Sequence, residues 1–338
     1  MLLYVPNQRG MLIRWLLTIF LAGIFLPEVR AQDPEYSQFF ANPLTLNPAF
    51  AGTSELGRVV VNYRNQWPQR GATYTNYALS YDDFSDRLNT GWGFQISHDR
   101  QLNQLIRISA ASFHYAYHLS LGDYAFLSGG MQAGLVYKQL DPSSLVFPGM
   151  INQLTGVVTG NLPANLEYAD LFYPDFAFGV VGQLHDFFGG FSFHHLNQPT
   201  ESLLTGDQEG KLPLKFTVHL GGRIHRLHRE LLSREFTLSP NLIYQQQGPF
   251  RQLNTGIYMI EHPLLFGVWY RNNLSVKPDA LIFLLGIAMN RFQLGYSFDY
   301  TLSRLSAFSY GSHEISLAFY FGELIGMPNR RRLLIPPV

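Results

Sequence analysis

Ser112 and His114 are the two residues of this chain that come nearest to a hydrolytic site. They lie two positions apart in a segment that alternates apolar and polar residues, so they share one face of the predicted strand. A serine beside a histidine, with a third polar group such as asparagine nearby, is the arrangement of a nucleophile and its base. No surrounding motif supports that chemistry, and polar pairs of this kind also line protein interiors. We therefore predict no catalytic residue.

The histidines do not predict a metal site either. His194 and His195 are neighbours in an extended segment, so their side chains point to opposite faces and cannot jointly bind one ion from that strand. The chain has no cysteine, which excludes disulfides, thiolate metal ligands and a cysteine nucleophile. The sequence also holds no phosphate-binding loop, His-Glu-x-x-His motif or calcium loop. We expect no metal-binding residue, no cofactor-binding residue and no cofactor.

Charged residues inside apolar strands carry the strongest structural information. Four arginines fall within predicted strands: Arg64, Arg107, Arg223 and Arg271. A charge on a lipid-facing surface costs roughly 2–4 kcal/mol at mid-bilayer, so each arginine should face inward or lie near an interface. The carboxylates that could pair with them include Asp99, Asp299 and Glu314. Such pairs suit either a plugged interior or a selective channel, and the bulky side chains on the small-polar faces favour the plugged interior.

The elements that position these residues are strands. In residues 292–300, apolar side chains at even positions alternate with small or polar ones at odd positions, which is the period of a strand with two different faces. Fourteen segments are predicted as strands: 58–67, 72–83, 91–101, 104–121, 124–140, 173–184, 187–197, 212–227, 235–247, 250–261, 263–272, 279–289, 291–301 and 312–321. An even number of strands lets an up-and-down barrel close with both ends on one side.

The composition indicates which solvent meets the apolar faces. Charged residues make up 14% of the chain and aromatic residues 15%, while the mean hydropathy is −0.01. No helical segment offers itself as cover, so the apolar faces are expected to meet lipid. The prediction is an all-β, up-and-down antiparallel transmembrane β-barrel of about 14 strands. A soluble two-layer sandwich is the alternative. The zero net charge argues against nucleic acid as a partner.

The two ends of the chain differ from the barrel segments. Arg9 and Arg14 precede an apolar run over residues 15–26, and Ala31 offers a small residue for cleavage, so residues 1–31 are predicted to be a signal peptide. An uncleaved membrane anchor is the alternative. Residues 32–56 do not alternate and form a predicted periplasmic or plug segment, or a partly ordered leader. The barrel is expected over 57–322, and a periplasmic tail over 323–338.

Aromatic residues near strand ends could form the girdles of a membrane protein, where an amphipathic ring sits at headgroup level. The candidates are Tyr63, Trp67, Tyr81, Trp92, Tyr137, Trp269, Tyr270 and Tyr320.

Several stretches of the sequence resemble one known family. They are DPEYSQFF at 33–40, NPL at 42–44, LNPAFAG at 46–52, YRNQWP at 63–68, GVWYR at 267–271, YTLS at 300–303 and GSHEI at 311–315. These motifs are similar to those of the PorP/SprF family, outer-membrane proteins of the type IX secretion and gliding system of Bacteroidetes. The likeness covers the whole chain after the predicted signal peptide.

The resemblance implies a non-enzymatic barrel in the outer membrane. It also implies periplasmic ring and lipoprotein components, the inner-membrane motor and secreted surface adhesins as partners. Our hypothesis is that residues 33–52 and the tail face the periplasmic machinery, while 141–172 and 198–211 face secreted cargo. The partner-binding candidates are Asp33, Pro34, Tyr36, Gln38, Asn42, Pro43, Asn47, Pro48, Arg330, Arg331 and Arg332.

Two other functions compete with a secretion scaffold. A fatty-acid-channel-like transporter of small hydrophobic molecules would also have fourteen strands and an amino-terminal plug. A barrel lipase built on Ser112 is the third possibility.

Overall fold

A computed structural model describes most of the chain after the predicted signal peptide. The described residues are 33–54, 56–68, 73–122, 124–141, 145–146, 148–152, 155, 157–158, 169–201, 210–228, 235–274, 277–289, 291–302 and 310–322. The chain divides into two compact units, Met1–Asp33 and Pro34–Val338, and the fold described below lies in the second. No helix among the described residues is long and apolar enough to cross a membrane.

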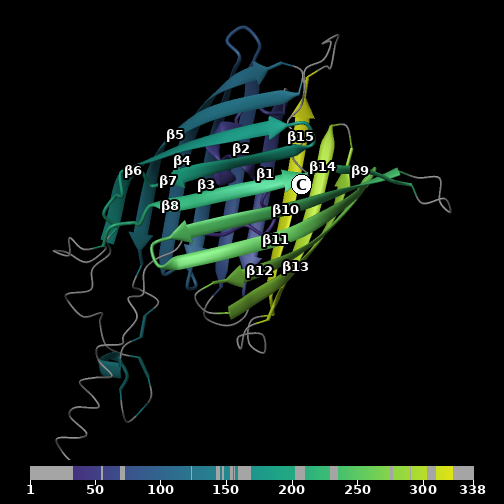
Figure 1. Cartoon of the computed structure of the whole chain (residues 1–338). Helices are drawn as coiled ribbons and strands as arrows, with labels where there is room; N and C mark the ends of the chain where they lie inside the picture. The colour runs from purple at the N-terminus through teal and green to yellow at the C-terminus, as the bar shows by residue number, and fades with distance from the viewer. Residues whose placement is uncertain are drawn as a thin grey trace, which may run out of the picture. The chain divides into compact units, whose positions relative to one another are not determined.

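The second unit is built almost entirely of strands (Figure 1). The strands are β1 (Gly57–Gln66), β2 (Tyr74–Ser85), β3 (Thr90–Gln101), β4 (Ile106–Leu121), β5 (Ala125–Leu140), β6 (Ala169–Leu184), β7 (Phe187–His194), β8 (Lys215–Gly222), β9 (Ile224–His228), β10 (Glu235–Gln247), β11 (Phe250–Glu261), β12 (Leu264–Asn273), β13 (Lys277–Ala288), β14 (Phe292–Thr301) and β15 (Ser312–Phe321). The short helices are α2 (Pro43–Leu46), η1 (Pro48–Phe50) and η3 (Pro148–Met150).

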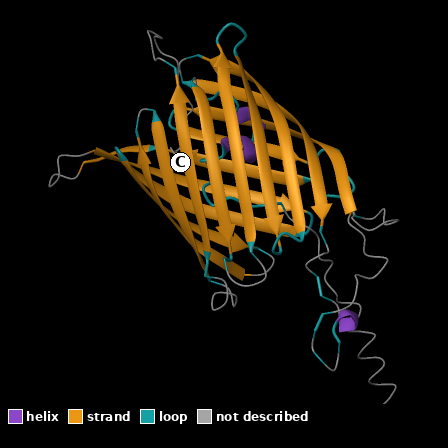
Figure 2. Ribbon diagram, turned by 180° about the vertical axis from the view of Figure 1, so that it is seen from behind, coloured by secondary structure: helices purple, strands orange, loops and turns teal. Residues whose placement is uncertain are grey.

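These strands close into a barrel, which the ribbon shows as a continuous wall (Figure 2). Apart from β8, each strand pairs antiparallel with the next, and β1 pairs with β15 to seal the wall. Both β8 and β9 pair with β10 and are separated only by Arg223, so they occupy one position in the wall. The wall therefore has fourteen positions, and the predicted antiparallel barrel is confirmed.

The two ends of the barrel carry connections of different length. We call the end where β1 begins and β15 ends the near end, and the opposite end the far end. The near-end connections span 86–89, 122–124, 185–186, 229–234, 262–263 and 289–291. The longest far-end connections span 141–168, 195–214 and 302–311. Short turns at one end and longer loops at the other are typical of membrane barrels, whose longer loops face the cell exterior.

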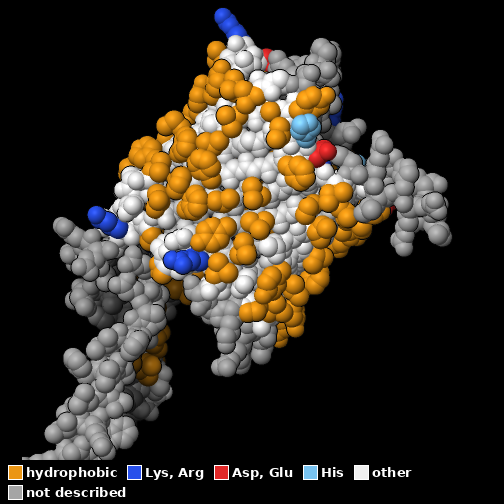
Figure 3. All heavy atoms as spheres, in the orientation of Figure 1, with side chains coloured by type: hydrophobic (Ala, Val, Ile, Leu, Met, Phe, Trp, Pro, Cys, Tyr) orange, Lys and Arg blue, Asp and Glu red, His pale blue; other side chains and the backbone are white. Residues whose placement is uncertain are grey.

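The outer face of the wall is apolar and the inner face is largely polar. On β3, the side chains of Phe94 and Ile96 are 54% and 59% exposed, whereas Gln95 between them is 8% exposed. Space-filling spheres show apolar side chains over much of the visible outer face (Figure 3). Exposed apolar side chains and a buried amide are the reverse of a soluble sheet, and they fit a wall whose outside meets hydrocarbon.

One predicted girdle residue faces the interior instead. Trp269 is fully buried, and its ring lies 4.9 Å from that of Phe39 and 5.5 Å from that of Tyr258. Trp269 shares its strand face with Arg271, whereas the neighbouring Val268 is exposed. The girdle prediction is therefore wrong for Trp269, because the period of two assigns it to the inner face. The other seven candidates keep part of their surface exposed.

Residues 34–54 form a plug inside the barrel. The segment contains α2 and η1, which are visible within the wall (Figure 2). Leu44, Ala49 and Phe50 are fully buried, as are the polar residues Ser37 and Gln38. Two Asn-Pro pairs shape the segment, because each proline stands at the start of a helical turn that Asn42 or Asn47 precedes. The sequence allowed a periplasmic or a plug segment, and the structure has the plug.

Three glycines of the wall make room for the plug. A Cβ atom added at Gly91 would lie 1.9 Å from the carbonyl oxygen of Ala51. At Gly130 it would lie 2.5 Å from the Cα atom of Ala49, and at Gly179 it would lie 2.1 Å from Oδ1 of Asn47. The plug backbone at β3 and β5, and the Asn47 side chain at β6, therefore lie at distances that no residue with a Cβ atom permits.

Gly130→Ala should displace the plug or destabilise the barrel, because its new methyl group meets the plug backbone. We expect a loss of about 1–3 kcal/mol in the free energy of unfolding, as for other overpacked interiors. The neighbouring Gly129→Ala is the matched control, since a Cβ atom there has no neighbour within 4 Å. Urea unfolding in detergent measures both variants, and equal effects would contradict the close contact.

Candidate functional site

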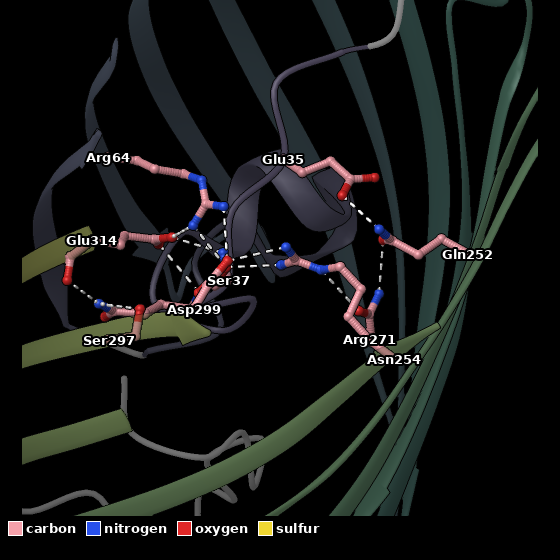
Figure 4. A network of polar contacts seen from close by, with 10 residues as sticks. Glu35, Ser37, Arg64, Gln252, Asn254, Arg271, Ser297, Asp299 and Glu314 are labelled. Atoms are coloured by element: carbon pink, nitrogen blue, oxygen red, sulfur yellow. Dashed lines mark hydrogen bonds and ion pairs between the residues drawn. The ribbon is translucent and has the colours of Figure 1, made fainter. Parts of the chain in front are cut away.

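Four buried charged side chains form a cluster on the inner wall at the far end (Figure 4). They are Arg64 of β1, Arg271 of β12, Asp299 of β14 and Glu314 of β15. Arg64 lies 2.9 Å from Asp299 and 3.1 Å from Glu314, and Arg271 lies 3.1 Å from Asp299. All four are at most 5% exposed, so each charge depends on the others and on hydrogen bonds for its stability.

The plug inserts Ser37 into the centre of this cluster. The Ser37 hydroxyl donates to Asp299 Oδ2 at 2.6 Å and accepts from Arg64 at 2.7 Å and from Arg271 at 2.8 Å. Its backbone N–H donates to Glu314 Oε2 at 2.7 Å. One small residue thus contacts all four charged groups. The cluster and the plug are therefore one hydrogen-bonded unit rather than two independent parts.

Residues beside Ser37 extend the same contacts around the wall. The Gln38 side chain donates to the Glu314 carbonyl oxygen at 2.9 Å and accepts from Ser316. The Tyr36 hydroxyl donates to Asn76 on β2. On the opposite side, Gln252 of β11 donates to Glu35 Oε2 at 2.7 Å (Figure 4). The bond to the Glu35 carboxylate is charge-assisted and therefore stronger than a neutral one.

A second set of polar contacts binds the part of the plug that lies toward the near end. The Asn47 amide donates to the backbone carbonyl oxygens of Val180 at 3.2 Å and Phe191 at 2.9 Å. Asp82 accepts from the backbone N–H of Gly52 at 2.8 Å and is also paired with Arg58 at 2.8 Å. The plug is therefore bonded to opposite sides of the wall, which prevents it from sliding as a loose segment.

The remaining surface of the plug is covered by an apolar core. Phe39 and Phe40 pack against Trp269, and the Phe40 ring lies 5.6 Å from that of Phe188. The apolar core also includes these buried residues: Leu46, Ala49, Phe50, Val181, Ile243, Tyr258, Ile260, Leu265, Ile282 and Leu284. This part of the barrel interior resembles the core of a soluble domain, in which apolar side chains exclude water.

The prediction of inward-facing, paired arginines is confirmed for Arg64 and Arg271, with Asp299 and Glu314 as the expected partners. Arg107 takes the other predicted option and lies near the rim, where it pairs with Asp141 at 3.1 Å.

Most partner-binding candidates lie inside the barrel. Tyr36, Gln38, Asn42, Pro43, Asn47 and Pro48 are all buried. Asn42 accepts a hydrogen bond of 3.1 Å from Gln95 on β3. Pro34 is half-buried, and Asp33 ends the preceding compact unit. Arg330, Arg331 and Arg332 lie outside the described residues. Contact of any of these residues with a partner stays a prediction.

The structure brings Ser112 and His114 together. Ser112 Oγ and His114 Nε2 are 2.9 Å apart, and the His114 ring is fully buried. No hydrogen bond to His114 Nδ1 comes from the described part of the chain, and Nδ1 is the atom that the third group of a catalytic set would bind. Within the described residues there is also no group of three or more side chains placed to hold a metal ion.

A closed wall with an apolar outside and a polar, filled inside defines a transmembrane β-barrel of the outer-membrane type. The sequence profile of one family, described as "Type IX secretion system membrane protein PorP/SprF", matches residues 28–319. The chain therefore belongs to the PorP/SprF family and is an outer-membrane protein of the type IX secretion system.

Solved structures of other barrels are weakly similar to this one. A deletion mutant of the TodX monoaromatic hydrocarbon channel has 11% identity and a TM-score of 0.43, over 81% of this chain and 92% of that chain. Omp33 of Acinetobacter baumannii has 8% identity and a TM-score of 0.41, over 79% and 100%. The KdgM porin in complex with disordered oligogalacturonate has 6% identity and a TM-score of 0.38, over 78% of this chain and 99% of that chain. No curated protein matches the chain.

Arg64→Met should lower the free energy of unfolding by about 3–5 kcal/mol, because Glu314 is then left buried without its cation. Arg107→Met is the matched control. The Arg107 and Asp141 side chains are 36% and 25% exposed, so loss of their ion pair should cost less than about 1 kcal/mol. The temperature at which the folded band is lost on SDS gels ranks the two variants. Similar temperatures would show that the buried cluster does not stabilise the barrel.

Proposed function

We propose that this chain is a plugged, non-enzymatic scaffold barrel of the type IX secretion system. The observation that supports this function is the plug itself, which is bonded to the wall by the Ser37 cluster, by Asn47 and by Gly52. A channel for diffusing solutes needs a continuous open path, whereas this interior is filled by a buried polar cluster and an apolar core. A filled barrel offers its two ends as binding surfaces instead.

The non-enzymatic part of the proposal rests on the surroundings of Ser112 and His114. A serine nucleophile needs a base that a third group orients, together with room for a substrate. Among the described residues, none bonds His114 Nδ1, and the ring has no exposed surface. The pair therefore serves the packing of the inner wall in this proposal.

The two ends of the barrel would meet different partners. The near end, with its short turns and the following tail, would dock the periplasmic ring and the motor behind it. Arg330, Arg331 and Arg332 give the tail three adjacent positive charges, which suit an acidic partner surface. The far-end segments 141–172 and 198–211 would assist export or surface retention of secreted adhesins.

A transporter of small hydrophobic molecules is the competing function. Its apolar binding site would have to lie near Trp269, where the interior is most apolar. Phe39 and Phe40 of the plug already occupy that region, with ring centroids 4.9 Å and 6.4 Å from the Trp269 ring. Transport would therefore require removal of these two side chains together with the polar contacts of Ser37.

Purified protein in planar lipid bilayers should show no steady open current, because the plug fills the interior. The comparison variant replaces residues 37–50 with a glycine-serine linker of equal length, which removes the side chains that fill the barrel. We expect conductance from that variant only. A steady current through the unmodified chain would favour the transporter over the scaffold.

Reversal of the tail charges tests the docking surface. The triple change Arg330→Glu, Arg331→Glu and Arg332→Glu should reduce copurification of periplasmic ring components, because a positive surface becomes negative. The corresponding triple change to lysine keeps the charge and should retain the partners. Both variants should keep a heat-modifiable barrel. Unchanged copurification after charge reversal would contradict docking through the tail.

A further inference from the structure

The plug begins at the far end of the barrel. Glu35 contacts Gln252, the third residue of β11, which descends from the far end. Tyr36 bonds to Asn76, the third residue of β2, which also starts there. Ser37 contacts Glu314, the third residue of β15. Three strands around the wall therefore place the first residues of the plug at the same end.

The plug ends at the near end. The backbone carbonyl oxygen of Ala51 lies 2.8 Å from His118 Nε2, close to the end of β4. Gly52 bonds to Asp82 near the end of β2, and both of these strands finish at the near end. The chain then passes directly into β1, which starts at Gly57 on that side.

The contacts between these two points follow in order. Asn42 meets Gln95 in the middle of β3, and the carbonyl oxygen of Leu46 accepts from Ser192 on β7 at 2.8 Å. The carbonyl oxygen of Ala49 accepts from Ser128, the fourth residue of β5, at 2.8 Å. Since β5 starts at the near end, Ala49 lies close to that end of the barrel. The plug thus crosses the interior once, from the far end to the near end.

From this path we infer that Pro34, at the start of the plug, lies at the extracellular mouth of the barrel. The long connections 141–168, 195–214 and 302–311 all lie at the far end, which identifies that end as the outer one. The first strand begins at the periplasmic end of the barrel. The plug that precedes it runs inside the wall from the extracellular end to the periplasmic end. Pro34, the first residue of this compact unit, is therefore part of the cell-surface face of this protein. It is accessible there to extracellular partners and not to the periplasmic ring, in contrast to the periplasmic location that our sequence hypothesis gave to residues 33–52.

The inference does not depend on the proposed scaffold function. It concerns only the side of the membrane from which Pro34 can be reached. A plugged barrel could still dock the ring through its near end if the inference failed. Conversely, the surface location would stand if no ring component copurified.

Single cysteines test this location directly, because the chain contains no cysteine. Pro34→Cys reports on the start of the plug. Asn103→Cys lies in an exposed far-end turn, and Arg87→Cys lies in an exposed near-end turn. Intact cells are treated with a membrane-impermeant maleimide, and a second sample is treated after the outer membrane is permeabilised. Only variants that keep the heat-modifiable folded band are compared.

We expect Pro34→Cys to react in intact cells as Asn103→Cys does, and Arg87→Cys to react only after permeabilisation. Reaction of Pro34→Cys only after permeabilisation would overturn the inference, as would reaction of Arg87→Cys but not Asn103→Cys in intact cells. A short epitope inserted between Asp33 and Pro34 provides the second readout if the thiol is shielded. Antibody binding to intact cells supports the surface location, and binding only after permeabilisation overturns it.

Discussion

The structure depends on one electrostatic constraint, which is that charges in the barrel interior need partners there. Arg64 and Arg271 balance Asp299 and Glu314, and the four come from strands β1, β12, β14 and β15. A cluster of this kind fixes the distance between strands that are far apart in the sequence. Ser37 completes it, because its hydroxyl and backbone N–H reach all four groups. The wall and the plug therefore depend on each other.

The wall is also shaped to receive the plug. Gly91 and Gly130 leave room for the plug backbone, and Gly179 leaves room for the Asn47 side chain. Trp269 fills the opposite side against Phe39. Small residues on one side and large ones on the other leave an interior that suits this segment. The apolar outer face meets lipid, so the barrel has two separate apolar surfaces, one toward the membrane and one toward its own plug.

The strands and the buried charges could be predicted from the sequence, because both follow from a local period of two and the cost of a charge in lipid. The predicted bounds of β10, β11 and β15 agree with the structure at every residue. The path of residues 34–54 could not be predicted, since it has no period and its contacts join Ser37 to Glu314 across most of the chain. Gly130 and Gly129 look alike in the sequence, yet only Gly130 faces the plug.

The order of the chain places a demand on biogenesis. The plug precedes every strand, and the seam that closes the wall joins the first strand to the last, with Gly57 opposite Phe321 and Gln66 opposite Ser312. If the wall closed first, the segment carrying Phe39, Phe40 and Phe50 would have to enter through one end of the finished barrel. It would then have to move along a densely packed interior. The seam is therefore best closed last, with the sheet curling around a segment already in position. The plug, which is the first part of this unit to be synthesised, would then act as the template around which the strands assemble.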